Sequence, residues 1–523
     1  MKLLELENKS EWEEKGFELF RYDREKIRKN TLEAPEWIHF GAGNIFRAFP
    51  AAQLNTLLNE KIYNKGVIVS EGFDYDIIDK AYKPYDDLSL LVVLKANGTI
   101  EKKVIGSVVE SIKADIYEKD EWNKLEKIFK NPSLQMASFT ITEKGYTVTK
   151  NSEEYKTLKP NAIMGKVTLL CYIRYKAGKY PLALVSMDNC SHNGEKVYNA
   201  VMAYAEAWAE NGLVEKEFIN YLKTKVSFPW SMIDKITPRP DKNVCDMLKS
   251  DNFEDNDIII TDKNTYTAPF VNAEEAQYLV IEDNFPNGRP PFEKAGVIFT
   301  DRETVNKVEK MKVCTCLNPL HTTLAVFGCL LSYNSIHEEM KDKDLVKLIE
   351  KIGYDEGMPV VVNPEIINPM KFIKEVLEVR LPNPFMPDTP QRIATDTSQK
   401  LPIRFGETIK AYVQREDLDV KNLKYISLVF AGWIRYIMGI NDNGEKFEIS
   451  PDPLLDEVKE YVKNIKLGGS EEYSKILKSL LSNEKIFGVN LYEVGLADKV
   501  IEYFGELAAG KGAVRNTLNK YLK

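Results

Sequence analysis

The chain has 523 residues, 44% hydrophobic and 29% charged, which is more than one compact core holds, so we expect two domains. A formal net charge of −8 without a long basic run argues against nucleic acid as the main partner. The opening MKLLELENKSEWEEKGF lacks the apolar core of a signal peptide, and the run LAVFGCLL at 324–331 is far shorter than the roughly 20 residues that span a bilayer. We therefore expect a cytoplasmic protein with no membrane partner.

In the first half of the chain, β-rich runs alternate with helical stretches. The segment EWIHFGAGNIFRAF at 36–49 predicts a strand, a tight turn and a helix in succession. Further strands are predicted at 66–73, 88–98, 137–146, 181–189 and 256–262, with helices at 113–131 and 193–211. Alternation of this kind is typical of a largely parallel sheet that is covered by helices.

A glycine turn lies between the first strand and its helix. Gly41 would allow the tight turn, and Gly43 would let the backbone approach a pyrophosphate at the helix N-terminus. Glu71 ends the second strand, where its carboxylate can accept hydrogen bonds from a ribose diol and repel a 2′-phosphate. The third glycine of the dinucleotide fingerprint is absent, so a purely structural turn stays open as an alternative. The candidate residues for binding the cofactor NAD are Gly41, Gly43, Asn44, Phe46, Arg47 and Glu71.

The character of the chain changes after the Pro- and Gly-rich segment EDNFPNGRPPFEKAGV at 282–297. Residues 303–355, 407–440 and 454–523 have the spacing of amphipathic helices and few strand signals. The predicted fold class is therefore α/β. We expect a Rossmann-type coenzyme domain with an N-terminal arm over residues 1–290 and a mainly α-helical substrate and catalytic domain over 291–523.

The segment MKVCTCLNPLHTT at 311–323 carries three polar side chains in apolar surroundings, those of Lys312, Asn318 and His321. Two interpretations are open for the last two. Asn318 would be a favoured helix N-cap before Pro319, and a histidine on an apolar helix is often a core residue. Lys312 favours a functional interpretation, because a lysine in a buried segment is costly unless it is paired or its pKa is lowered. A lysine with a lowered pKa exchanges protons readily near neutral pH.

The cysteines of the same segment suggest a second interpretation, a metal site. Cys314 and Cys316 form a C-x-C pair close to His321, which raises the question of a zinc site. The sequence has no second cluster to complete four ligands, so we expect no metal and interpret the two cysteines as small buried side chains. Six cysteines in the whole chain are too few for a disulfide framework.

Seven motifs follow one another along the chain. They are HFGAGNIFRAF (39–49), TITEKGY (140–146), SMDNCSHNG (186–194), FPWSMIDKITP (228–238), EDNFPNGRPPFEKAGVIFTD (282–301), EKMKVCTCLNPLH (309–321) and DTPQRIATDTSQKLP (388–402). In this order they resemble the polyol-specific long-chain dehydrogenases and reductases, the mannitol dehydrogenase family, over nearly the whole chain. The resemblance implies a two-domain enzyme that transfers hydride between NAD(H) and a ketose or keto-acid carbon without a metal.

The resemblance also implies roles for individual residues. Lys312 matches the general acid/base, and Asn318 and His321 match residues that orient the reacting oxygen. Glu309 matches a carboxylate near the lysine that could relay a proton. Asn189 and Asp234 match positions at the substrate side of the coenzyme domain, Asn189 also beside the cofactor, and Arg392 and Lys400 match groups that hold the substrate chain. One departure is that five residues separate Lys312 from Asn318, whereas the family has four.

The version CLNPLHTT, together with Arg392 and Lys400, most resembles the fructuronate reductase and D-mannonate oxidoreductase branch of this family. We therefore expect interconversion of D-fructuronate and D-mannonate, with a small sugar acid or polyol as the partner, because a substrate carboxylate suits a bidentate arginine. Tagaturonate/altronate and mannitol/fructose remain alternatives. A non-catalytic nucleotide-binding sensor is a more distant one, since it predicts loss of the Lys–Asn–His set. The oligomeric state stays open, with a monomer among the options.

Overall fold

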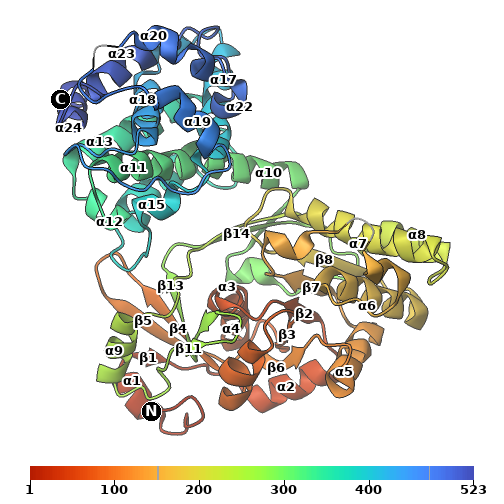
Figure 1. The fold of residues 1–523 in the computed structure, drawn as a ribbon. Coiled ribbons are helices and arrows are strands. Elements are labelled where there is room, and N and C mark those ends of the chain that lie inside the picture. Colours follow the sequence, from red (N-terminus) through yellow and green to blue (C-terminus); the bar gives the residue numbers. More distant parts are fainter. Residues whose placement is uncertain (150–151, 470) are drawn as a thin grey trace. The chain divides into compact units, whose positions relative to one another are not determined.

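The computed structural model describes residues 1–149, 152–469 and 471–523, which form two compact units, Met1–Asn306 and Lys307–Lys523 (Figure 1). The main sheet of the first unit is six-stranded and parallel throughout, in the order β6-β3-β2-β7-β8-β9. Its strands are β2 (Trp37–Phe40), β3 (Val67–Glu71), β6 (Val108–Lys113), β7 (Met136–Phe139), β8 (Leu182–Ser186) and β9 (Val226–Ser227). In chain order the strands run 3-2-1-4-5-6 across the sheet, which is the arrangement of Rossmann-type dinucleotide-binding domains and confirms the predicted fold class.

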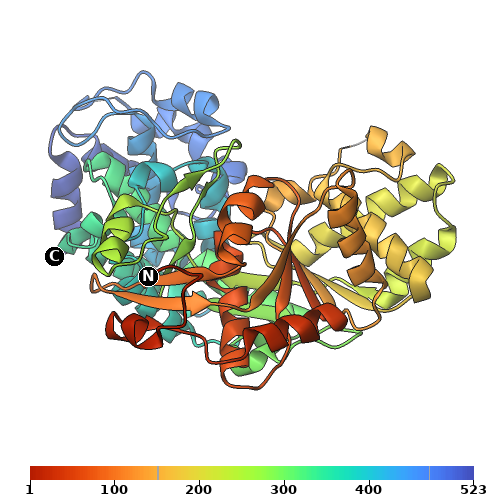
Figure 2. The same cartoon turned by 90° about the horizontal axis from the view of Figure 1, so that it is seen from below.

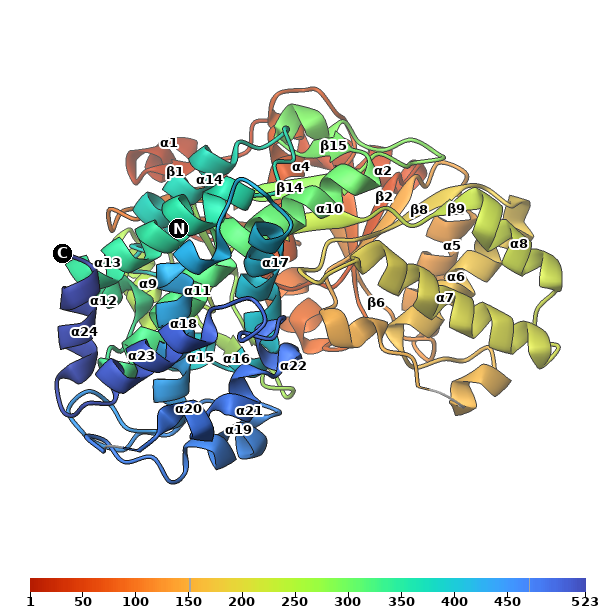
Figure 3. The ribbon, with the colours of Figure 1, turned by 90° about the horizontal axis from the view of Figure 1, so that it is seen from above.

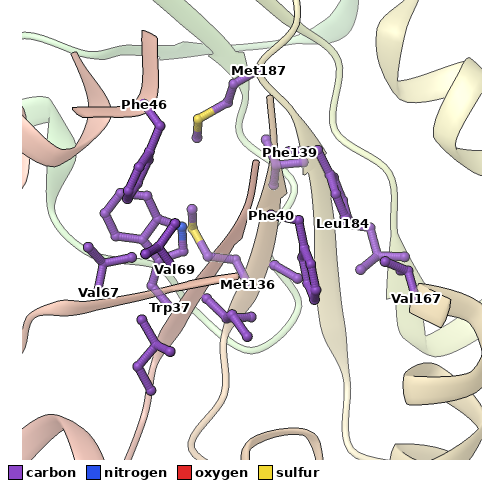
Figure 4. Close-up of a cluster of buried hydrophobic side chains, with 14 of the residues drawn as sticks. Trp37, Phe40, Phe46, Val67, Val69, Met136, Phe139, Val167, Leu184 and Met187 are labelled. Carbon is purple, nitrogen blue, oxygen red and sulfur yellow. The ribbon is translucent and has the colours of Figure 1, made fainter. Parts of the chain in front are cut away.

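Helices bury both faces of this sheet. Trp37 of β2 packs against Phe46 on one face, while Phe40 packs against Phe129 on the other (Figure 4). Figure 4 also shows Leu184 and Val167 on the side of Phe40. Burial on both faces explains why the central strands are nearly continuous apolar runs rather than alternating ones.

The helices of the first unit connect these strands. They are α1 (Lys9–Glu14), α2 (Arg24–Glu33), α3 (Asn44–Ala48), α4 (Pro50–Asn59), η1 (Ile78–Tyr82), η2 (Lys83–Tyr85), α5 (Lys119–Lys130), η3 (Glu143–Tyr146), η4 (Glu153–Lys156), α6 (Ile163–Gly178), α7 (Asn193–Glu210), α8 (Lys216–Lys225), α9 (Lys242–Ser250) and η5 (Phe292–Ala295). Helices α5, α6, α7 and α8 pack successively on one another beside the sheet (Figure 3). Figure 2 shows the sheet with α2 running beneath it.

Two predicted strands lie outside the main sheet. Strand β4 (Ser89–Leu94) pairs antiparallel with β5 (Ile100–Ile105), because the chain reverses at Asn97 and Gly98, whose φ is +82°. They form a four-stranded sheet with β1 (Phe17–Glu18) and β13 (Phe270–Glu274), in the order β1-β5-β4-β13. The predicted strand at 256–262 contains only β11 (Ile259–Ile260), which pairs with β12 (Tyr266–Thr267). A further sheet joins β10 (Ser231–Asp234), β14 (Tyr278–Glu282) and β15 (Ile298–Thr300).

The second unit is mostly helical, as predicted. Its elements are α10 (Arg302–Met311, shared with the first unit), η6 (Lys312–Cys316), α11 (Asn318–Leu330), α12 (Ile336–Glu339), α13 (Lys343–Glu350), η7 (Lys351–Gly357), η8 (Met358–Val360), α14 (Pro369–Glu375), η9 (Val376–Arg380), α15 (Pro390–Ile393), α16 (Thr397–Leu401), η10 (Pro402–Gly406), α17 (Glu407–Val413), η11 (Val420–Asn422), α18 (Lys424–Ile437), α19 (Leu455–Val462), α20 (Tyr473–Ile476), α21 (Lys478–Leu481), α22 (Glu484–Phe487), α23 (Ala497–Leu507) and α24 (Ala513–Tyr521). At its centre, α18 packs against α11 and α23.

Elements α10, η6 and α11 form one helical run, Arg302–Leu330, which is long and apolar enough to cross a membrane by length and composition. However, 72% of its most apolar window is buried inside the protein, which is the behaviour of a core helix. Nine consecutive residues of α11, Thr322–Leu330, are buried, and α11 packs against helices of its own unit.

The glycine turn yields a stability prediction. Gly41 has φ +104°, and a Cβ there would lie 2.1 Å from the Thr140 carbonyl oxygen, whereas a Cβ on Gly43 meets nothing within 4 Å. We expect Gly41→Ala to lower the free energy of unfolding by about 1–3 kcal/mol or more, because it adds overlap to backbone strain. Gly43→Ala, the matched control, should stay within about 0.5 kcal/mol of the wild type. Thermal unfolding of both variants tests this, and equal stability would contradict the tight approach.

Candidate active site

The glycine turn lies at the carboxyl edge of the parallel sheet. Gly41 follows β2, Glu71 ends β3, Thr140 follows β7 and Asn189 follows β8. Strands β2 and β7 are neighbours, but the chain leaves them toward opposite sides of the sheet, to β3 and β8 respectively. Such a switch point is where open α/β sheets bind their ligands.

Glu71 holds the glycine turn against the next loop. Its carboxylate accepts hydrogen bonds from the backbone N–H of Ala42 at 2.8 Å, of Phe73 at 2.8 Å and of Asp74 at 3.2 Å. The residue is only 7% exposed. Its carboxylate therefore positions the turn, in addition to placing negative charge at this edge of the sheet.

The side chains that follow the turn differ in their burial and in their contacts. Phe46 is fully buried and stacks on His39 with ring centroids 4.1 Å apart. Arg47 is 1% exposed and donates to oxygens of residues 267–268 at 2.7 and 3.0 Å, and to Asn44 Oδ1 at 2.9 Å. Phe46 and Arg47 therefore support the turn from inside the unit, while half-buried Asn44 is the polar side chain nearest its surface.

Two more predicted residues belong to the first unit. Asn189 is exposed in the loop after β8. That loop is held by Asp188, whose carboxylate accepts from the backbone N–H groups of residues 141–142 at 2.9 Å each and from the Tyr146 hydroxyl at 2.6 Å. Asp234 is buried at the end of β10.

In the second unit, Lys312 opens a π-helical turn. The residue is 4% exposed, and its carbonyl accepts from the Leu317 N–H at 3.1 Å, five residues on. A π turn holds one residue more than an α turn, and such turns occur often at functional sites. The π turn can thus accommodate the one residue by which the spacing from Lys312 to Asn318 exceeds that of the family. Helix α11 follows this turn.

Asn318 is not the helix N-cap that one interpretation predicted. Leu317 occupies the cap position, without a side-chain capping hydrogen bond, and Asn318 is the first residue of α11. The Leu317 carbonyl already accepts the first hydrogen bond of α11, from the His321 N–H at 3.0 Å, so the helix begins one residue before an Asn318 cap would place it. Asn318 and His321 are three residues apart on α11 and therefore share one face.

His321 lies among charged side chains of its own unit. Its Nε2 is 3.4 Å from Asp388 Oδ2, and Asp388 forms an ion pair with Arg392. Burial, followed by repulsion from nearby cations, lowers the pKa of His321 to about 3, so the ring is neutral at physiological pH. The cations that act on it are Arg404, Arg392, Arg380 and Lys400.

Arg392 and Lys400 were predicted from the sequence, whereas Arg380, Arg404 and Asp388 were not identified as site residues. Arg380 ends η9 and Arg404 lies in η10, so no local spacing connects them, and only the tertiary fold gathers them near His321. Asp388 could have been identified from the sequence, because it precedes Arg392 by four residues, a spacing that allows an ion pair. Glu309, half-buried, precedes Lys312 by three residues on the same helical run.

The two cysteines of this segment are protonated thiols at neutral pH. Burial raises the pKa of Cys314 to about 11 and that of Cys316 to about 12. Among the described residues, no group of three or more His, Cys, Asp or Glu side chains is arranged to hold a metal ion.

Comparison with known proteins covers both units. The family model described as the mannitol dehydrogenase Rossmann domain matches residues 35–294, and that of the mannitol dehydrogenase C-terminal domain matches 304–507. The D-mannonate oxidoreductase of Thermotoga maritima is 54% identical, over 98% of this chain and 97% of that protein. The Pseudomonas fluorescens mannitol 2-dehydrogenase, solved as a ternary complex with NAD and D-mannitol, is 25% identical, with a TM-score of 0.71 over 100% and 99% of the two chains. A D-sorbitol dehydrogenase has the same fold, with a TM-score of 0.79 and 23% identity over 96% of this chain and 97% of that one.

The low pKa of His321 yields a prediction on pH dependence. Because the folded pKa of about 3 lies below the unfolded value near 6.5, this contribution to stability is present above about pH 6.5 and is lost as the pH falls toward 3. His39, whose pKa burial also lowers to about 3, acts in the same direction. We expect the ring signals of both histidines in NMR spectra to stay constant between about pH 5 and 8. Titration of His321 near pH 6 would show that the cluster is open to water.

Proposed function

The chain belongs to the mannitol dehydrogenase family, and from this premise we propose that it interconverts D-fructuronate and D-mannonate by hydride transfer with NAD(H). It is an NAD-dependent oxidoreductase that acts on a small sugar acid or polyol. The observation that carries the proposed substrate is the group of cations around His321, which suits a sugar acid. The similarity to a D-mannonate oxidoreductase over nearly the whole chain supports the same substrate.

The residues of the first unit fit NAD. The turn at Gly41 and Gly43 leaves open space where a Cβ of Gly43 would lie, so its backbone can approach a pyrophosphate closely. Gly41, Phe46 and Arg47 would keep the turn in shape, and Asn44 and Asn189 would contribute polar contacts. The negative charge of Glu71 would disfavour a 2′-phosphate, so we expect NAD(H) to be preferred over NADP(H). When bound, NAD accepts or supplies the hydride.

In the second unit, Lys312 is proposed as the general acid/base. In the direction of reduction, its ammonium group would stabilise the negative charge that develops on the carbonyl oxygen and then give up its proton. Asn318 and neutral His321 would each donate a hydrogen bond to the same oxygen. In oxidation, neutral lysine would take the proton, and Glu309 would relay it to solvent. We propose that this proton chemistry needs no metal.

The remaining predicted residues would hold the rest of the substrate. Asp234 and Asn189 in the first unit, and Arg392 and Lys400 in the second, are proposed to hold polar groups along its chain. Oxidoreduction of mannitol and fructose is a second candidate, because a mannitol 2-dehydrogenase shares the fold over the full chain. Tagaturonate and altronate would need the same chemistry. A non-catalytic sensor is disfavoured because Lys312, Asn318 and His321 are all present. We place the enzyme in the cytoplasm.

A spectrophotometric substrate screen tests the proposed function. NADH oxidation should be fastest, by kcat/KM, with D-fructuronate, slower with D-tagaturonate and slowest with D-fructose, because only the acids carry a charge that complements the cations around His321. NADPH run in parallel should be the poorer coenzyme. A preference for fructose would favour the mannitol assignment. If NADH is oxidised with none of the three substrates, the proposed class of substrates is contradicted.

Substitutions of Lys312 and Asn318 test the mechanism. Lys312→Ala should lower kcat about 10²–10⁴-fold, the range for general acid–base catalysis, with little change in NADH affinity. Asn318→Ala should lower kcat about 10²–10³-fold if it donates to the reacting oxygen. A purely structural Asn318 would cost about 1 kcal/mol of stability and leave turnover intact. Measuring kcat and thermal unfolding on the same proteins separates these outcomes, and near-normal turnover of a stable Lys312→Ala enzyme would assign the acid/base role elsewhere.

A further inference from the structure

The cations near His321 differ in whether a negative charge of the protein already neutralises them. Arg392 forms an ion pair with Asp388 one helical turn away, and its side chain is 59% exposed. The Lys400 ammonium donates to the backbone carbonyls of Ile393 and Thr395, and the nearby carboxylates of Asp396 and Asp452 offset part of its charge. Arg404, by contrast, has a neutral partner, since its Nη1 donates to the hydroxyl of Thr322. Within residues 1–149, 152–469 and 471–523, no carboxylate forms an ion pair with Arg404.

Arg404 is also partly buried, and burial lowers the pKa of its guanidinium to about 10. The group is still charged at neutral pH, so the protein holds a desolvated positive charge without a negative partner of its own. Such a charge is costly unless an anion accompanies it. An anionic group of a ligand would supply that partner.

The place of Arg404 suits a substrate group that is near the reacting carbon but separate from it. Thr322, its hydrogen-bond partner, is fully buried and follows His321 directly on α11. Of the nearby cations, Arg404 lowers the pKa of His321 the most. With Nη1 bound to Thr322, the Nε and Nη2 groups remain as the two parallel donors that match a carboxylate.

We propose that Arg404 recognises the carboxylate of the sugar acid and so determines the preference for hexuronates over uncharged ketoses. This inference rests on the proposed function. It assigns the bidentate arginine to Arg404 in η10 instead of Arg392, which is already engaged with Asp388. Thr322 acts as a positioning residue that holds the guanidinium beside His321.

The test compares D-fructuronate with D-fructose, both reduced with NADH, in the wild type, Arg404→Met and the matched control Arg415→Met, which replaces an exposed arginine of the same unit that pairs with Asp417. Methionine keeps an unbranched apolar stem and removes the charge. For Arg404→Met, the ratio of kcat/KM for fructuronate to that for fructose should fall by at least about 30-fold, mainly through KM, the scale for loss of a buried charged partner. For Arg415→Met, the same ratio should stay within about threefold, because exposed charges contribute little.

Thermal unfolding and NADH binding establish that each variant is folded. If Arg404→Met does not fold, Arg404→Lys carries the test, and the ratio should fall by at least about fivefold because lysine cannot form the two-donor fork. An unchanged ratio in a folded Arg404 variant overturns the inference, as does a comparable fall with Arg415→Met. Failure of the wild type itself to reduce fructuronate would instead overturn the proposed function, so the two failures are distinguishable.

Discussion

The proposed active site depends on a π turn in the middle of a buried helix. Lys312 opens the π turn at Lys312–Cys316, and Asn318 and His321 lie on α11, which begins after a bend at Leu317. The neighbouring α11 is almost entirely buried against helices of its own unit, which leaves little freedom for these side chains to shift. Fixed donors of this kind stabilise developing charge without having to reorganise during the reaction.

Electrostatics then distinguishes the roles of the groups around that helix. Burial and four nearby cations keep His321 neutral, so it can donate a hydrogen bond without acting as a competing acid. The same cations create a local positive field in a chain whose net charge is −8. At the carboxyl edge of the Rossmann sheet the situation is reversed, since Glu71 brings negative charge into the glycine turn while using that charge to bind three backbone N–H groups. Local charge, rather than net charge, would therefore match each site to its proposed ligand.

Several predictions failed where a local signal was interpreted without its surroundings. The strand at 88–98 was placed in the main sheet, yet the Asn97–Gly98 turn pairs it with its neighbour in a different sheet. Strand β6 was not recognised, because its alternating polar residues resemble the start of the predicted helix. Asn318 is a residue type typical of an N-cap, but Leu317 occupies the cap position and Asn318 is already the first residue of the helix. In each case a residue pattern reports local propensity, whereas pairing and continuity depend on distant segments.

The sequence by itself determined the α/β class, the helical second half, the glycine turn and the family. Apolar periodicity, turn chemistry and the order of motifs are local properties that can be recognised in the sequence alone. It also pointed to Lys312, Asn318 and His321, since polar groups in an apolar run stand out locally. Only the tertiary structure decided that a π turn absorbs the longer spacing, that Glu71 binds the turn, and that Arg380 and Arg404 join Arg392 and Lys400 near His321. These features depend on which distant segments pack together, and burial, not sequence spacing, decides which of their charges lack a partner.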